Sequence, residues 1–211
     1  MDTQLNQENK KLVASFWQQL EGQAAGQVDV VVKQFMAPAA PWHGPDPINR
    51  LDGAEAFNSG FWRPLMQSFP DLRRHTHILF GGKSNGRIDG LQDGRMWVTG
   101  TGSLQGTFEK DYLGIPASGG IVNIRWGEFC RIEDGKIAET FFLLDLVDLI
   151  QQAGFDVLPP SLGKDGLYPP PQAGDGVLLE AQNEQESAYS LAHIRRFIFE
   201  GLNSYDESAL E

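Results

Sequence analysis

The hydrophobic pattern of this 211-residue chain changes its period near residue 73, and this change restricts the fold more than any other feature. Before it, apolar side chains recur at helical spacing in residues 9–21, 28–36 and 53–68. After it, apolar and polar side chains alternate in four segments, residues 75–80, 96–104, 121–132 and 136–144. Helices followed by an antiparallel sheet predict an α+β domain with the helices on one face of the sheet.

Three glycines, Gly100, Gly102 and Gly127, lie inside the predicted strands. Glycine within a strand is typical of bulges and sharp bends. We therefore expect the sheet to be strongly curved.

The chain continues beyond this domain, which we place at residues 1–156 and which ends with a short predicted helix at 146–153. Residues 157–186 are rich in proline and glycine and are predicted to form an extended arm or linker. Residues 187–211 return to helical spacing, with apolar positions that resemble those of the first helix. They are either the start of a second, truncated repeat or a helix that covers a sheet.

The formal net charge of -11 restricts the partners of the protein. Nucleic acids and anionic membrane surfaces both attract positively charged proteins, so we expect neither partner. No apolar run approaches the ~20 residues of a membrane span, and the first residues lack the pattern of a signal peptide. The single cysteine, Cys130, excludes an internal disulfide and is expected to be a packed thiol. These features predict a cytoplasmic protein.

Three motifs follow one another between residues 101 and 145. They are TGSLQG at 101–106, YLGIPASG at 112–119 and EFCRIEDGKIAE at 128–139, with Asp145 closing the last strand. In order and spacing they resemble the SnoaL-like polyketide cyclases of the nuclear-transport-factor-2-like superfamily. The resemblance implies a cone-shaped α+β barrel, in which helices pack in the concave face of a curved, mainly antiparallel sheet around an apolar pocket.

The same resemblance implies a small organic ligand, cofactor-free chemistry on carbonyl compounds, and a homodimer formed through the outer face of the sheet. Two polar positions of the family are apolar in this chain. Phe142 stands where the polyketide cyclases carry a catalytic aspartate, and Leu104 stands where relatives often carry a histidine. A search for the chemistry therefore has to consider other residues.

Glu128 is the first candidate for proton transfer. Strand alternation places it on one face with Ile124, Trp126 and Cys130, which is the expected interior. Burial raises the pKa of a carboxyl group and suits a general acid or base near neutral pH. The alternative is a structural glutamate held by an arginine or a backbone amide.

His43 is the second candidate, because imidazole titrates near neutral pH and residues 41–49 form a proline-rich loop or short extended piece. Asp46 could orient it, although a loop-stabilising histidine is the alternative. Asp145 is a weaker catalytic candidate, since an acid immediately before the helix at 146–153 is a good N-cap. His75 and His77 have a spacing that could bind a metal, but no third ligand stands out, so we predict no metal site.

Aromatic side chains are the predicted walls of the pocket, because they suit a flat, apolar ligand. The predicted ligand-binding residues are Trp42, Trp62, Trp97, Trp126, Phe142 and Thr140. Core packing is the alternative for each tryptophan. Three functions remain open: a cofactor-free cyclase, isomerase or hydrolase; a non-catalytic ligand-binding module; and one half of a tandem scaffold.

Overall fold

The computed structural model describes residues 3–21, 27–84, 94–160, 162–163 and 171–203. The chain divides into two compact units, Met1–Leu179 and Glu180–Glu211. The first unit contains the sheet and the helices that cover it. None of the helices within the described ranges has the length and apolar character needed to cross a bilayer.

A six-stranded sheet forms the first unit, in the order β2-β1-β6-β5-β4-β3. Its strands are β1 (Pro41–His43), β2 (Arg50–Asp52), β3 (Arg73–Lys83), β4 (Met96–Thr107), β5 (Ile121–Glu133) and β6 (Lys136–Leu144). Neighbouring strands are antiparallel except for β1 and β6, which are parallel. The predicted α+β class with a mainly antiparallel sheet is confirmed, and the sheet is an open one.

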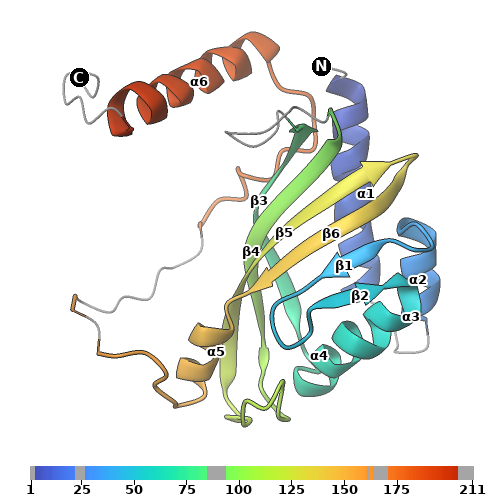
Figure 1. Ribbon diagram of the computed structural model, residues 1–211, viewed down its shortest axis with the longest axis vertical. Coiled ribbons are helices and arrows are strands. Elements are labelled where there is room, and N and C mark those ends of the chain that lie inside the picture. The colour runs from blue at the N-terminus through green and yellow to red at the C-terminus, as the bar shows by residue number, and fades with distance from the viewer. Residues whose placement is uncertain (1–2, 22–26, 85–93, 161, 164–170, 204–211) are drawn as a thin grey trace. The chain divides into compact units, whose positions relative to one another are not determined.

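The helices precede and follow the strands as the hydrophobic spacing predicts. They are α1 (Thr3–Glu21), α2 (Val28–Phe35), α3 (Gly53–Phe57), a π-helical turn (Asn58–Trp62), α4 (Arg63–Ser68) and α5 (Leu146–Gln152). In Figure 1, α1 passes behind the strands, and its apolar stripe of Val13, Phe16, Trp17 and Leu20 is buried. Burial of this stripe against the sheet is the main stabilisation of α1.

Strand β5 shows how the sheet separates its two faces. Its even-numbered residues from Val122 to Ile132 are buried, while its odd-numbered residues are half-buried or exposed. Glu128 is therefore on the buried face, as the alternation predicts, and it faces the helices together with Trp126 and Cys130. Cys130 is a buried free thiol.

A β-bulge interrupts strand β3 at His77 and changes the expected alternation. The register with β4 skips His77 between Thr76 and Ile78. At this point the chains approach so closely that a Cβ atom on Gly102 would lie 1.9 Å from the backbone oxygen of His75. Only glycine fits there. Because of the bulge, His75 and His77 do not share one face of the strand in the way that regular alternation predicts.

The predicted loop at residues 41–49 contains an additional strand. Trp42 and His43 pair in parallel with Thr140 and Phe141 of β6, and antiparallel with Leu51 and Arg50 of β2. The short extended alternative is therefore correct for residues 41–43, whereas residues 44–49 form the loop between β1 and β2. Three-residue strands are too short to show a hydrophobic period, which is why the sequence did not reveal β2.

The second unit contains α6 (Glu184–Arg196), which continues as a π-helical turn to Leu202. Asn183 caps α6, because its side chain accepts hydrogen bonds from the backbone N–H groups of Gln185 and Glu186. The helix thus begins three residues before the predicted start at Ser187. Residues 204–211, the end of the predicted helix, lie outside the described residues. The choice between a second repeat and a covering helix stays open.

Candidate functional site

A buried ion pair joins β3 to β5. Nη2 of Arg74 donates a hydrogen bond of 3.0 Å to Oε2 of Glu128, and the two side chains are only 5% and 3% exposed. Buried ion pairs contribute little net stability, because the loss of hydration offsets their attraction. The pair therefore invites a functional explanation.

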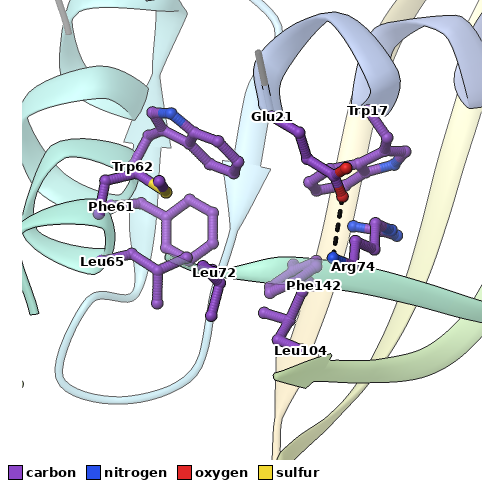
Figure 2. A pocket seen from close by; sticks show the side chains of 10 residues that line it. Trp17, Glu21, Phe61, Trp62, Leu65, Leu72, Arg74, Leu104 and Phe142 are labelled. Atoms are coloured by element: carbon purple, nitrogen blue, oxygen red, sulfur yellow. Dashed lines mark hydrogen bonds between the residues drawn. The ribbon is translucent and has the colours of Figure 1, made fainter. Parts of the chain in front are cut away.

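Two tryptophans hold the guanidinium of Arg74 between them. Its Cζ atom lies 3.4 Å from the ring centroid of Trp17 in α1 and 3.4 Å from that of Trp126 in β5. Both rings attract the cation through their π faces. Glu21 holds the backbone of Arg74, since its Oε1 accepts a hydrogen bond of 3.0 Å from the backbone N–H of Arg74; Figure 2 shows this contact. Arg74 is consequently held in a single orientation.

Burial changes the acidity of both partners. Loss of hydration raises the pKa of Glu128 to about 7, although the positive charge of Arg74 works against this rise. Loss of hydration also lowers the pKa of Arg74 to about 10, and Glu128 limits that decrease. Near neutral pH the carboxyl group of Glu128 is thus suited both to accept and to donate a proton.

A cavity of about 190 Å³ lies against this pair. Among the described residues, its walls come from α1, β3, β4 and β5, together with Val177 from the segment that follows α5. Arg74, Glu128, Thr76, Gln18 and Glu21 are its polar lining residues. For comparison, an apolar cavity of about 150 Å³ in another protein holds a benzene molecule. The space suits a one-ring or small two-ring compound.

A second void, shown in Figure 2, is nearly filled by its lining side chains and has a volume of only about 10 Å³. Phe142, Leu104, Phe61 and Trp62 are among its lining side chains. This volume is about that of a single water probe. The two apolar replacements noted in the sequence therefore fill the space beside them.

Two nitrogen atoms of Arg74, Nε and Nη1, have no hydrogen-bond acceptor in the described part of the chain, and both are buried. Buried donors in proteins almost always have a partner, and an unpaired one is costly. Arg74 lines the 190 Å³ cavity, so a bound oxygen atom in that cavity is a suitable acceptor.

The structure does not bring His43 and Glu128 together. In β1, Trp42 points inward beside Thr140, so His43 aligns with Phe141 on the opposite face of the sheet. There its ring stacks on Phe141 at 4.4 Å, and its Nε2 lies 3.3 Å from Oε1 of Glu139. A proton-transferring pair of His43 and Glu128 is therefore wrong, because the sheet separates them.

The predicted ligand-binding residues divide into four groups. Trp126 lines the larger cavity, while Trp62 and Phe142 line the small void. Trp42 and Thr140 are buried in the core. Trp97 lies on the outer face, where its ring is 6.2 Å from that of Phe141, so its placement as an inner wall is wrong.

The acidic candidates at the ends of elements have structural contacts. Asp145 caps α5 by accepting the N–H of Asp148 at 3.0 Å, and it pairs with Arg125 at 2.6 Å. Asp46 accepts a hydrogen bond from Asn49 within the loop. Within the described ranges, no group of three or more histidine, cysteine or acidic residues could hold a metal ion.

Sequence reasoning missed Arg74 and Trp17 as site residues. Arg74 lies next to Arg73 at the start of β3, and two adjacent arginines give no sign that one of them is buried. The expectation that an arginine would hold a buried Glu128 was a signal that could have found it. Trp17 was assigned only to the buried stripe of the first helix, and its ring also lies against the guanidinium of Arg74.

Solved structures with similar folds were found at low sequence identity. A protein from Jannaschia sp. CCS1, proposed to be a SnoaL-like polyketide cyclase, has 19% identity and a TM-score of 0.55, covering 73% of this chain and 95% of its own. IdmH of Streptomyces antibioticus, also a proposed polyketide cyclase, has 18% identity and a TM-score of 0.53, covering 69% and 97%. These likenesses show the fold.

Curated proteins gave no match of significance. The family model described as SnoaL-like polyketide cyclase matches residues 11–153. This range extends from α1 through α5 and includes the ion pair, both of its tryptophans and the three sequence motifs. By this match the chain belongs to the SnoaL-like polyketide cyclase family.

Proposed function

We propose that the protein binds a small, largely apolar carbonyl compound in the 190 Å³ cavity and transfers protons on it through Glu128. The observation that carries the proposal is that Arg74, whose Nε and Nη1 have no acceptor among the described residues, lines this cavity together with Glu128. A ligand carbonyl oxygen satisfies them, and the surrounding tryptophan, valine and leucine side chains accommodate its apolar part.

Proton transfer follows from the same arrangement. Glu128 takes a proton from the carbon next to the carbonyl, and the electrons of the broken C–H bond move to the carbonyl oxygen. Arg74 stabilises the negative charge that develops on that oxygen, since its guanidinium is fixed beforehand between two rings. In a conjugated ketone, return of the proton to a different carbon gives isomerisation. Attack of the carbanion on the carbon of a second carbonyl group gives cyclisation, and the proton held by Glu128 then goes to the oxygen of that second group.

Hydrogen exchange of 2-tetralone, a two-ring ketone, tests this proposal. In D₂O the protein is expected to accelerate exchange of the protons next to the carbonyl, as followed by proton NMR. Glu128→Gln should retain binding, measured by tryptophan fluorescence, and lose the acceleration. His43→Gln is the matched control on the other face and should exchange like the wild type. Equal exchange by wild type and Glu128→Gln would refute the proton-transfer role.

The same experiment separates the enzyme from a non-catalytic binding module. Phe142 and Leu104 favour the module, because they fill the place of the family's polar groups. Binding of 2-tetralone without accelerated exchange by the wild type would favour that alternative.

We also propose a homodimer formed through the outer face of the sheet. Five apolar side chains of that face are 41–59% exposed: Ile78, Phe80, Phe129, Phe141 and Leu143. Contiguous exposed apolar surface is typical of an interaction site. Light scattering should give twice the monomer mass, and Phe129→Glu should give the monomer mass; a monomeric wild type would contradict the proposal. The cytoplasmic location and the absence of a nucleic-acid partner stay predictions.

A further inference from the structure

Residues 174–179, which we call the strap, run along β3, the edge strand of the sheet. Val177 forms an isolated parallel bridge with Leu79, and the N–H of Leu79 donates to the backbone oxygen of Gly176 at 2.9 Å. On the other side, Nζ of Lys10 in α1 donates to the backbone oxygen of Leu178. The strap thus connects the edge strand to α1.

Val177 gives the strap a place in the proposed ligand site. It lines the 190 Å³ cavity, whose other lining residues, as far as the chain is described, belong to α1, β3, β4 and β5. Among the described residues it is also the one lining residue outside residues 11–153, the range that matches the family model. This wall of the cavity is therefore an addition to the family domain.

The strap is held less firmly than the other walls. Gly176, Val177 and Leu179 are only half-buried, and Leu178 is exposed. In contrast, β3 pairs with β4 at ten positions from Arg73 to Lys83. Segments with few buried contacts and exposed backbone hydrogen bonds open locally while the rest of the protein stays folded.

Gly176 makes the close approach of the strap to β3 possible. A Cβ atom at this position would lie 2.3 Å from the backbone oxygen of His77, in the bulge. A methyl group there must push the strap away from the edge strand. Gly174, in the same strap, has no atom within 4 Å of the corresponding point. The two glycines therefore form a matched pair for an experiment.

We propose that the strap is a movable wall of this partly open cavity, that its displacement widens the entrance for the ligand, and that Val177 sets the size of the ring system that fits. The inference rests on the proposed binding of carbonyl compounds in this cavity. Lifting of the strap breaks the hydrogen bond between Leu79 and Gly176 and withdraws Val177 from the space next to Leu79. Ligand association then depends on the rate and extent of this opening.

Gly176→Ala tests the movement of the strap in two measurements on the full chain. Amide hydrogen exchange at Leu79, without any ligand, is expected to be about tenfold faster than in the wild type. The association rate of 2-tetralone, followed by tryptophan fluorescence, should rise with it. Gly174→Ala should change neither rate. Faster exchange at Leu79 with an unchanged association rate would refute this role of the strap, and so would unchanged exchange at Leu79.

Val177→Ala tests the effect on ligand size. The shorter side chain should improve binding of 2-acetylnaphthalene relative to 2-tetralone by roughly tenfold, the effect of a few carbon atoms in an apolar pocket. An unchanged ratio would contradict the role of Val177. Thermal unfolding at the wild-type temperature shows that the variant is folded.

The results also separate this inference from the proposed chemistry. If 2-tetralone binds but the wild type does not accelerate exchange of the ketone's own protons, the proton-transfer proposal fails, whereas the association rates still test the strap. If exchange of the ketone's protons depends on Glu128 but the association rate is the same in Gly176→Ala, the strap proposal fails alone. Absence of binding by both wild type and Gly176→Ala would overturn both proposals.

Discussion

Glu128→Gln should change how the stability of the protein depends on pH. The amide is nearly the same size as the carboxyl group and retains an oxygen that can accept the hydrogen bond from Nη2 of Arg74. What it removes is a buried group that titrates. The expected result is therefore a difference in the slope of stability against pH, in addition to a constant difference from the altered contact with Arg74.

The sign follows from the raised pKa. Between its ordinary value of 4.5 and about 7 in the fold, Glu128 is protonated in the folded protein and ionised in the unfolded chain. The folded state then binds more protons, so stability falls as pH rises through this range. Each pH unit changes the free energy by about 1.4 kcal/mol. The wild type should thus lose up to about 3 kcal/mol relative to Glu128→Gln between pH 4.5 and 7.

Urea denaturation at several pH values between 4 and 8 measures this difference, because the contributions of all other groups cancel between the two proteins. Glu55→Gln, at an exposed position of α3, removes the same charge and is the matched control. The curve of this variant shows how much of any difference follows from the removal of one negative charge at the surface. Parallel curves for wild type and Glu128→Gln would refute the argument that burial raises the pKa of Glu128.

Three further substitutions test the packing of the first unit and the cap of α5. Phe142→Ala should cost about 3–5 kcal/mol in urea denaturation, the usual loss for a buried phenylalanine, and a loss below about 1 kcal/mol would contradict its filling role. Gly102→Ala should unfold at a much lower temperature, because its Cβ would lie 1.9 Å from a backbone oxygen of β3. Gly127→Ala, whose nearest atom would be 4.0 Å away, is its control. Asp145→Ala should cost about 1 kcal/mol through the lost cap of α5, and Asp145→Asn much less.

The features that follow from repeated local patterns could be predicted from the sequence. The spacing of apolar residues predicted α1, α2 and the helical segment from Gly53 to Ser68. Alternation predicted β4, β5 and β6 and placed Glu128 on the buried face. Asp145 was expected as a helix cap because the acid directly precedes α5, and it has that contact.

The features that depend on contacts between distant segments could not be predicted. Arg74 meets Glu128 across 54 residues of sequence, and the pairing of β1 with β6 decides which way His43 points. The bulge at His77 shifts the alternation of β3 by one residue, and no local signal marks it. In the same way, a proline- and glycine-rich segment gives no sign that Val177 reaches the cavity.

The titration of Glu128 itself is the most direct test of the proposed site. Carbon-13 NMR of the Glu128 side-chain carboxyl, identified by its absence in Glu128→Gln, follows its ionisation as pH is varied. The expected midpoint is near 7, because burial of the carboxyl group beside the cavity opposes its charge. A midpoint near 4.5 would mean that Arg74 keeps the carboxylate fully ionised, and it would contradict a role for Glu128 in proton transfer at neutral pH.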